Sequence, residues 1–114
     1  MGLIGGRRAL LHQNLPECVV DLMAYFKPTL NILDSVRLLK ANGPQGSTLK
    51  DVVELNTVAA STDPVRIDAF GVSLFGDALF SNDPAAFPHI QEAIKRGLGT
   101  ADFAGEGYME VNLG

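Results

Sequence analysis

The 114-residue chain has little of what most familiar sites require. Cys18 is its only cysteine, and one thiol cannot form an internal disulfide, a cysteine-rich zinc site or an iron–sulfur cluster. No run of lysine and arginine is longer than two residues, as at Arg7 and Arg8, and the net charge is −4. No apolar run approaches the length that crosses a bilayer. We therefore expect no nucleic-acid partner, no membrane association and a reduced, cytoplasmic setting.

Sequence motifs that indicate a particular catalytic or cofactor chemistry are also missing. The sequence contains no HExxH, no serine-nucleophile elbow, no dinucleotide-binding glycine fingerprint and no paired cysteines. The glycine-containing loop of residues 42–47 lacks the lysine and the spacing of a phosphate-binding P-loop. No cofactor is evident from these patterns, and the sequence leaves open whether the protein is an enzyme.

What is present is the composition of one globular domain. Apolar residues make up 46% of the chain and charged residues 19%. This balance is typical of a packed core, and the length suits a single domain over residues 1–114, with residues 1–13 expected to be flexible. The strongest local pattern is an apolar strand at residues 55–60 followed by a helix that begins at Pro64, is capped by Asp63 and ends at Gly76.

Weaker patterns predict the other elements. We expect a helix over residues 14–26 with a capping box of Asn14 and Glu17, and a short strand at 30–34 followed by a helical turn at 36–40. A helix is also expected around residues 90–98, with a final edge strand at 108–113. If strands 30–34 and 55–60 are parallel, the link between them suits a crossover. The predicted fold class is α/β, a mixed or parallel sheet of about three or four strands covered by helices.

Polar residues follow both predicted inner strands. In a parallel sheet their carboxyl ends would meet, and Asp34, Ser61, Thr62 and Asp63 would converge as a candidate ligand-binding site. The start of the following helix suits an anion. Carboxylates with hydroxyls instead suit a divalent metal such as Mg²⁺, and the sequence does not choose between the two.

Two further residues are second-tier candidates. Asp68 falls between Val65 and Val72 on an apolar helix face, where a carboxylate needs a partner. It is either a pin for a neighbouring loop or a poised carboxylate or metal ligand. His12 follows two leucines and is expected to be half-buried, as a packed residue or as a ligand or base.

Several ordered motifs together resemble one family, the uncharacterised family numbered 362 in the domain-of-unknown-function series. They are Arg8 with His12, residues 16–22, residues 27–35, residues 42–44 with Gly46, residues 60–65 with 67–69, and residues 97–99.

The resemblance implies an α/β domain and a longer protein. Members of that family often occur with ferredoxin-type iron–sulfur domains, and the similar region lies in their C-terminal half, so a fragment or a short homologue is expected here. This chain departs from the family pattern at Arg66, where a small residue is usual, and it lacks the cysteine-rich cluster domain. The family has no settled activity to carry over.

Three functional hypotheses follow from the residues and the resemblance, and the third of them is a hydrolase or transferase that uses a bound metal. The first is a ligand- or metal-binding domain of a redox-associated protein. The second is a structural or partner-docking module that uses the edge strand at residues 108–113 to pair with a protein partner or with another copy of itself.

Overall fold

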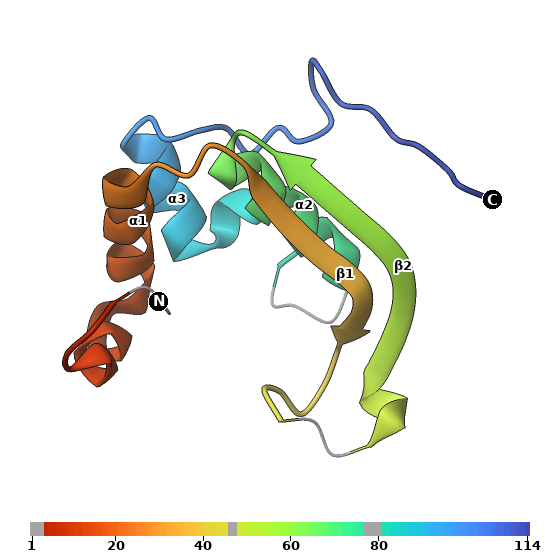
Figure 1. Cartoon of the computed structure of the whole chain (residues 1–114), viewed down its shortest axis with the longest axis horizontal. Helices are drawn as coiled ribbons and strands as arrows, with labels where there is room; N and C mark the ends of the chain where they lie inside the picture. The colour runs from red at the N-terminus through yellow and green to blue at the C-terminus, as the bar shows by residue number, and fades with distance from the viewer. Residues whose placement is uncertain (1–3, 46–47, 77–80) are drawn as a thin grey trace.

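The computed structural model describes residues 4–45, 48–76 and 81–114. Two antiparallel strands lie against one long helix, and two further helices pack beside it (Figure 1). The longer elements are α1 (Leu15–Phe26), β1 (Asn31–Leu39), β2 (Val52–Ser61), α2 (Pro64–Phe75) and α3 (Pro88–Lys95). Short 3₁₀ helices span Arg8–Asn14, Leu49–Asp51 and Pro84–Ala86. The expected α/β class is confirmed, and no helix of the described residues is long and apolar enough to span a membrane.

The sheet differs from the expected one. β1 and β2 pair antiparallel, from Asn31 opposite Ser61 to Leu39 opposite Val52, with a register shift between Ser35 and Arg37. The parallel pairing was therefore wrong, and in the described part of the chain the sheet has two strands. The expected helical turn at residues 36–40 instead extends β1, which leaves residues 40–51 as the link. That link holds one described 3₁₀ turn, whereas a parallel crossover usually needs a whole helix. Gly46 and Ser47 lie outside the described residues.

Residues 108–113, expected to form an edge strand, belong to no strand. They are exposed and run away from the helices as an extended segment (Figure 1). The Cα radius of gyration is 15.0 Å, whereas a compact chain of this length has about 13 Å. The excess is consistent with this extended end.

Helix α2 forms where the sequence predicts it. Pro64 occupies the first turn, and Gly76 follows the last helical residue with φ +54°. The buried side chains of α2 are Val65, Ile67, Ala69 and Val72, which lie on the two predicted apolar sides. Because α2 contacts both strands, it covers one face of the sheet and leaves the other open (Figure 1).

Helix α1 is present over the predicted residues but packs a different face. The spacing of its apolar residues predicts a buried face of Leu15, Val19, Leu22, Met23 and Phe26. Its buried residue is instead Val20, and Leu15 and Phe26 are 37% and 47% exposed. The capping box does not form, because the Asn14 amide donates to the Glu17 carboxylate at 2.6 Å and neither side chain caps the helix.

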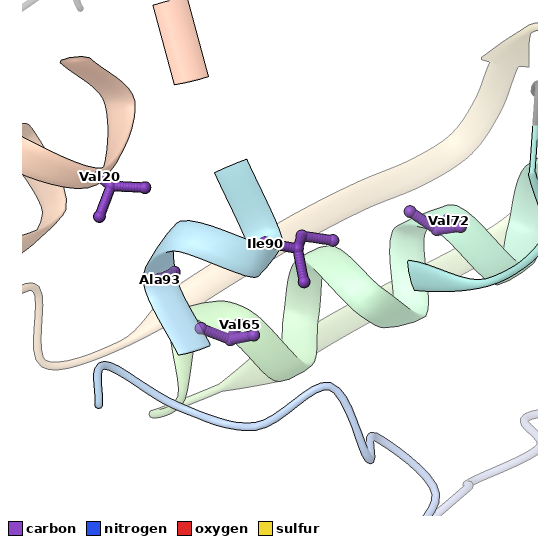
Figure 2. Packing of buried hydrophobic residues seen from close by; sticks show 5 residues of the cluster. All are labelled: Val20, Val65, Val72, Ile90 and Ala93. Atoms are coloured by element: carbon purple, nitrogen blue, oxygen red, sulfur yellow. The ribbon is translucent and has the colours of Figure 1, made fainter. Parts of the chain in front are cut away.

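Val20, Val65, Val72, Ile90 and Ala93 form the core cluster. Figure 2 shows that they come from α1, α2 and α3, with Ile90 of α3 lying between Val20 of α1 and Val72 of α2. The expected helix around residues 90–98 is α3, which ends at Lys95. Gly97, which suits a C-terminal cap, has φ +71°, and the Leu98 amide donates to the Ala93 carbonyl at 3.0 Å.

A surface network ties α1 to α3 and predicts a pH effect. The Arg96 guanidinium hydrogen-bonds the carboxylates of Glu92 and Asp21, and the bond from Arg96 holds the pKa of Glu92 below its ordinary value of 4.5. A lowered folded-state pKa stabilises the protein above pH 4.5, and this contribution is lost as pH falls through the folded-state value. We expect the stability advantage of the wild type over Glu92→Gln to shrink steadily below pH 4.5 in urea titrations. An advantage that grew on acidification would contradict this assignment.

Candidate functional site

Asp63 is the centre of the polar cluster at the end of β2. Its Oδ1 accepts from the amides of Val65 at 2.8 Å and Arg66 at 3.0 Å, which caps α2. Its Oδ2 accepts from the Thr100 amide at 3.0 Å and lies 3.8 Å from the Arg66 guanidinium. The carboxylate therefore joins the start of α2 to the segment that follows α3.

Two neighbours fix the position of this carboxylate. The Asp63 amide donates to the Ser61 hydroxyl at 3.0 Å, which sets the turn out of β2. On the other side Gly99 packs directly against the carboxylate, because a Cβ built there would lie 2.6 Å from the Asp63 carboxyl carbon. Glycine is thus required at residue 99 by close approach.

Arg66 also ties the segment that follows α3 to α2. Its Nη1 donates to the Glu106 carbonyl at 2.9 Å, and its side chain is about one-third exposed. Phe103 adds an apolar contact in the same segment, with its ring edge-to-face on Phe70 at 5.7 Å between centroids. Residues 99–106 are therefore held against α2 by polar and aromatic contacts together.

The other sequence candidates do not join this cluster. Asp34 lies within β1 opposite Val58, is exposed, and accepts from the Val36 amide at 3.0 Å. Asn31 is the residue opposite Ser61, so Asp34 is three residues, or about 10 Å, along the sheet from it. The expected convergence of Asp34 with Ser61 and Asp63 is therefore wrong, because it required parallel strands. Thr62 is exposed.

His12 is exposed in the 3₁₀ helix Arg8–Asn14, which contacts α1, so the expected half-burial is wrong. Cys18 is half-buried on α1.

Asp68 was expected on an apolar helix face where a carboxylate needs a partner, but it is exposed and lies at the border of that face. The His89 Nε2 lies 3.3 Å from its carboxylate, and the Asp68 side chain is 53% exposed. Both line a small cavity of about 30 Å³ with apolar residues of α1, α2 and α3, among them Val19 and Met23. This volume holds about two water molecules and not a substrate, so the pair links α2 to α3 beside the core.

A much larger groove follows the free edge of β2. Its volume is about 950 Å³, and its walls are residues 56–61 of β2 on one side and residues 107–114 on the other. On the side of the sheet that α2 covers, the groove is lined by Ile67, Phe70 and Leu74 of α2 and by Phe103. We call this feature the β2 groove. Polar and apolar side chains both line it, among them Asn56, Thr57 and Val111.

Sequence reasoning missed the roles of His89, Gly99 and Thr100. His89 lies four residues before the buried Ala93 and therefore borders the apolar face of α3, a spacing that the sequence shows. Gly99 carried a weaker signal, since Gly97 already ends α3 and a second glycine two residues later has no helical role. Nothing in the sequence indicated that the Thr100 amide reaches Asp63.

Comparison with known proteins gives one result. No curated protein and no solved structure matches the chain. A family model described as Domain of unknown function (DUF362) matches residues 1–73, which end within α2, so residues 97–99 of the resemblance lie beyond the match. Because the match covers more than half of the 114 residues, the chain belongs to the DUF362 family of domains of unknown function.

Proposed function

We propose that this chain is a partner-docking module whose incomplete sheet is completed by an extended polypeptide segment added along β2. The observation that carries the proposal is the β2 groove, which lies against a strand edge whose backbone groups have no strand partner in the described residues. An unpaired strand edge is a ready template for a further strand.

The outer face of the sheet supports the same reading. Ile32 and Val58 are 67% and 63% exposed, and Ala60, which pairs with Ile32, is exposed as well. Docking of a strand would extend the sheet and place new side chains beside these exposed apolar residues.

The ligand- or metal-binding function expected from the sequence has less support. Both oxygens of Asp63 accept hydrogen bonds from backbone amides, and Asp34 lies elsewhere on the sheet. No group of three or more histidine, cysteine or acidic side chains among residues 4–45, 48–76 and 81–114 is arranged to hold a metal ion. No observation favours a redox role. A stoichiometric metal in the purified protein that was lost in Asp63→Ala would favour this alternative.

Differential affinity capture tests the docking proposal. The tagged chain, Val58→Asp and Leu49→Asp are compared, because Leu49 is 90% exposed outside the sheet and serves as the matched control. We expect mass spectrometry to identify polypeptides that are retained by the wild type and by Leu49→Asp and reduced at least about tenfold by Val58→Asp, since a charge on the docking surface opposes desolvation.

Equal retention by all three baits would contradict docking along β2. Circular dichroism and urea midpoints establish that both variants remain folded, which is expected because the substituted side chains are mostly exposed.

A further inference from the structure

Residues 108–113 have the sequence pattern of a strand. Met109, Val111 and Leu113 alternate with more polar residues, and the three apolar side chains are 80%, 70% and 95% exposed. Strict alternation over six residues is typical of a strand with one buried face. The segment is therefore suited to pair with a strand edge, although it belongs to no strand in this structure.

The start of this segment is anchored beside the end of β2. The Arg66 guanidinium donates to the Glu106 carbonyl at 2.9 Å, and Arg66 lies in the first turn of α2, which follows β2 directly. The Tyr108 amide donates to the Gly105 carbonyl at 3.2 Å, which forms a turn at the start of the segment. Gly107 lies inside this turn with φ +84°, a conformation that glycine adopts without strain. Rotation at Gly107 can therefore move the segment while the anchor on α2 stays in place.

From this anchor the segment runs back alongside the free edge of β2. Figure 1 shows the two running in opposite directions, and residues 107–114 and 56–61 form opposite walls of the β2 groove. The edge of β2 is regular from Thr57 to Ser61, because Asn56, with φ +50°, lies at the register shift. A segment that starts beside Ser61 and runs antiparallel to β2 thus meets a regular strand edge.

We propose that residues 108–113 close onto β2 of their own chain as a third, antiparallel strand and thereby block the edge at which a partner docks. This inference rests on the proposed docking function and supplies its regulation. In this structure the β2 groove separates the segment from β2, which is the open state. A partner strand has access to the edge in the open state and is excluded from it in the closed state.

Tethering favours the chain's own β2 over the β2 of a second copy. Gly107 alone separates the anchored Glu106 from the segment. A short link gives an effective concentration in the millimolar range, and second copies in a micromolar solution are about a thousand times more dilute. The direction of the segment also gives antiparallel pairing with its own β2, which is the slightly more stable kind.

The apolar side of the segment selects the register of the closed state. A shift of one residue turns every side chain of a strand to the other face of the sheet. With Val111 beside the half-buried Thr57, the apolar side faces α2, where Phe70 and Phe103 line the groove. Closure in this register buries Val111 and leaves Asn112 on the open face of the sheet.

Hydrogen exchange of the full chain tests closure with a matched pair of variants. Val111→Asp and Asn112→Asp place the same charge on adjacent residues that face opposite sides of the segment. We expect alternate amides of residues 57–61 to be protected in the wild type and in Asn112→Asp. In Val111→Asp this protection falls at least about tenfold, because closure would bury the new charge. Protection in the wild type is unchanged by about a hundredfold dilution, since the segment is tethered.

Three outcomes overturn closure within one chain. They are no protection of these amides in the wild type, equal protection in Val111→Asp, and protection that disappears on dilution, which assigns the segment to a second copy. The docking function is judged separately. It stands after any of these outcomes if Val58→Asp still loses the captured polypeptides.

A fluorescein-labelled synthetic peptide of residues 107–114 measures whether closure blocks the edge. By fluorescence anisotropy we expect it to bind Val111→Asp at least about tenfold more tightly than the wild type or Asn112→Asp, because apparent affinity falls with the fraction of chains that are open. Equal affinity for the three proteins, or binding to none of them, overturns the blocking role of the segment.

Discussion

Ile90→Ala is expected to lower the free energy of unfolding by about 3–4 kcal/mol. This value is within the range for substitutions that truncate a large buried aliphatic side chain and leave a cavity. Ile90 is 1% exposed and belongs to the cluster in which Val20, Val65 and Val72 meet (Figure 2). Its side chain is the contact that holds α3 against α2, so its removal leaves a void bounded by three helices. Since a domain of this size has about 5–15 kcal/mol of stability, this one substitution removes a large share.

Urea denaturation followed by circular dichroism measures the effect, and Ile94→Ala is the control. Ile94 lies on the same helix, four residues later, and is 38% exposed. It undergoes the same chemical change with less burial, so its cost is expected to stay below about 1 kcal/mol. Similar losses for the two variants would mean that α3 is not anchored through Ile90.

The sequence predicts α2 well because its signals are local. Asp63 followed by Pro64, two apolar sides and Gly76 each act within a few residues, and each has its expected role in the structure. Helix α1 shows the limit of such reasoning. Its residues were correct, but the buried position is Val20, because the face that packs is chosen by where α3 lies.

The topology of the sheet could not be predicted from local sequence signals, because strand pairing depends on residues far apart in the chain. Residues 36–39 fit either a helical turn or a strand, and only pairing with residues 52–54 decides in favour of β1. The direction of pairing then follows from where β1 ends. Once β1 reaches Leu39, an antiparallel return is the short route, and the carboxyl ends of the two strands lie at opposite ends of the sheet.

Only the local part of the candidate site was predicted, because its other contacts join residues far apart in the chain. Asp63 was expected as a helix cap, and it is one. Its link to Thr100 joins residues 37 positions apart, and the requirement for Gly99 arises only from that approach. Asp34 was assigned to the site by an assumed strand direction, so it was lost when that direction proved wrong.

Asp63 and Gly99 are expected to show strong energetic coupling. Asp63→Ala removes two capping hydrogen bonds, about 1 kcal/mol together, and the Thr100 bond, about 1 kcal/mol more. Gly99→Ala is expected to cost about 2 kcal/mol in the wild type, because its new methyl group displaces the carboxylate from those same amides.

In an Asp63→Ala background the same Gly99→Ala change meets no carboxylate. Gly99 has no left-handed backbone conformation, so alanine there is expected to stabilise the chain by about 0.5 kcal/mol through the unfolded state. The effect of one substitution thus changes sign with the residue at position 63. Urea unfolding of the wild type, the two single variants and the double variant measures this coupling, expected at about 2–3 kcal/mol.

The cycle also separates the two roles considered for Asp63. If the Asp63 carboxylate only caps α2 and holds residues 99–100, it no longer stabilises the protein in the Gly99→Ala background. Added Mg²⁺ or Mn²⁺ then leaves all four unfolding curves unchanged. A carboxylate that binds a divalent cation gives a wild-type midpoint that rises with metal concentration, and Asp63→Ala abolishes the rise. Additive losses in the absence of metal would show that Gly99 is not constrained by the carboxylate, and the close approach at the start of α2 would then need another cause.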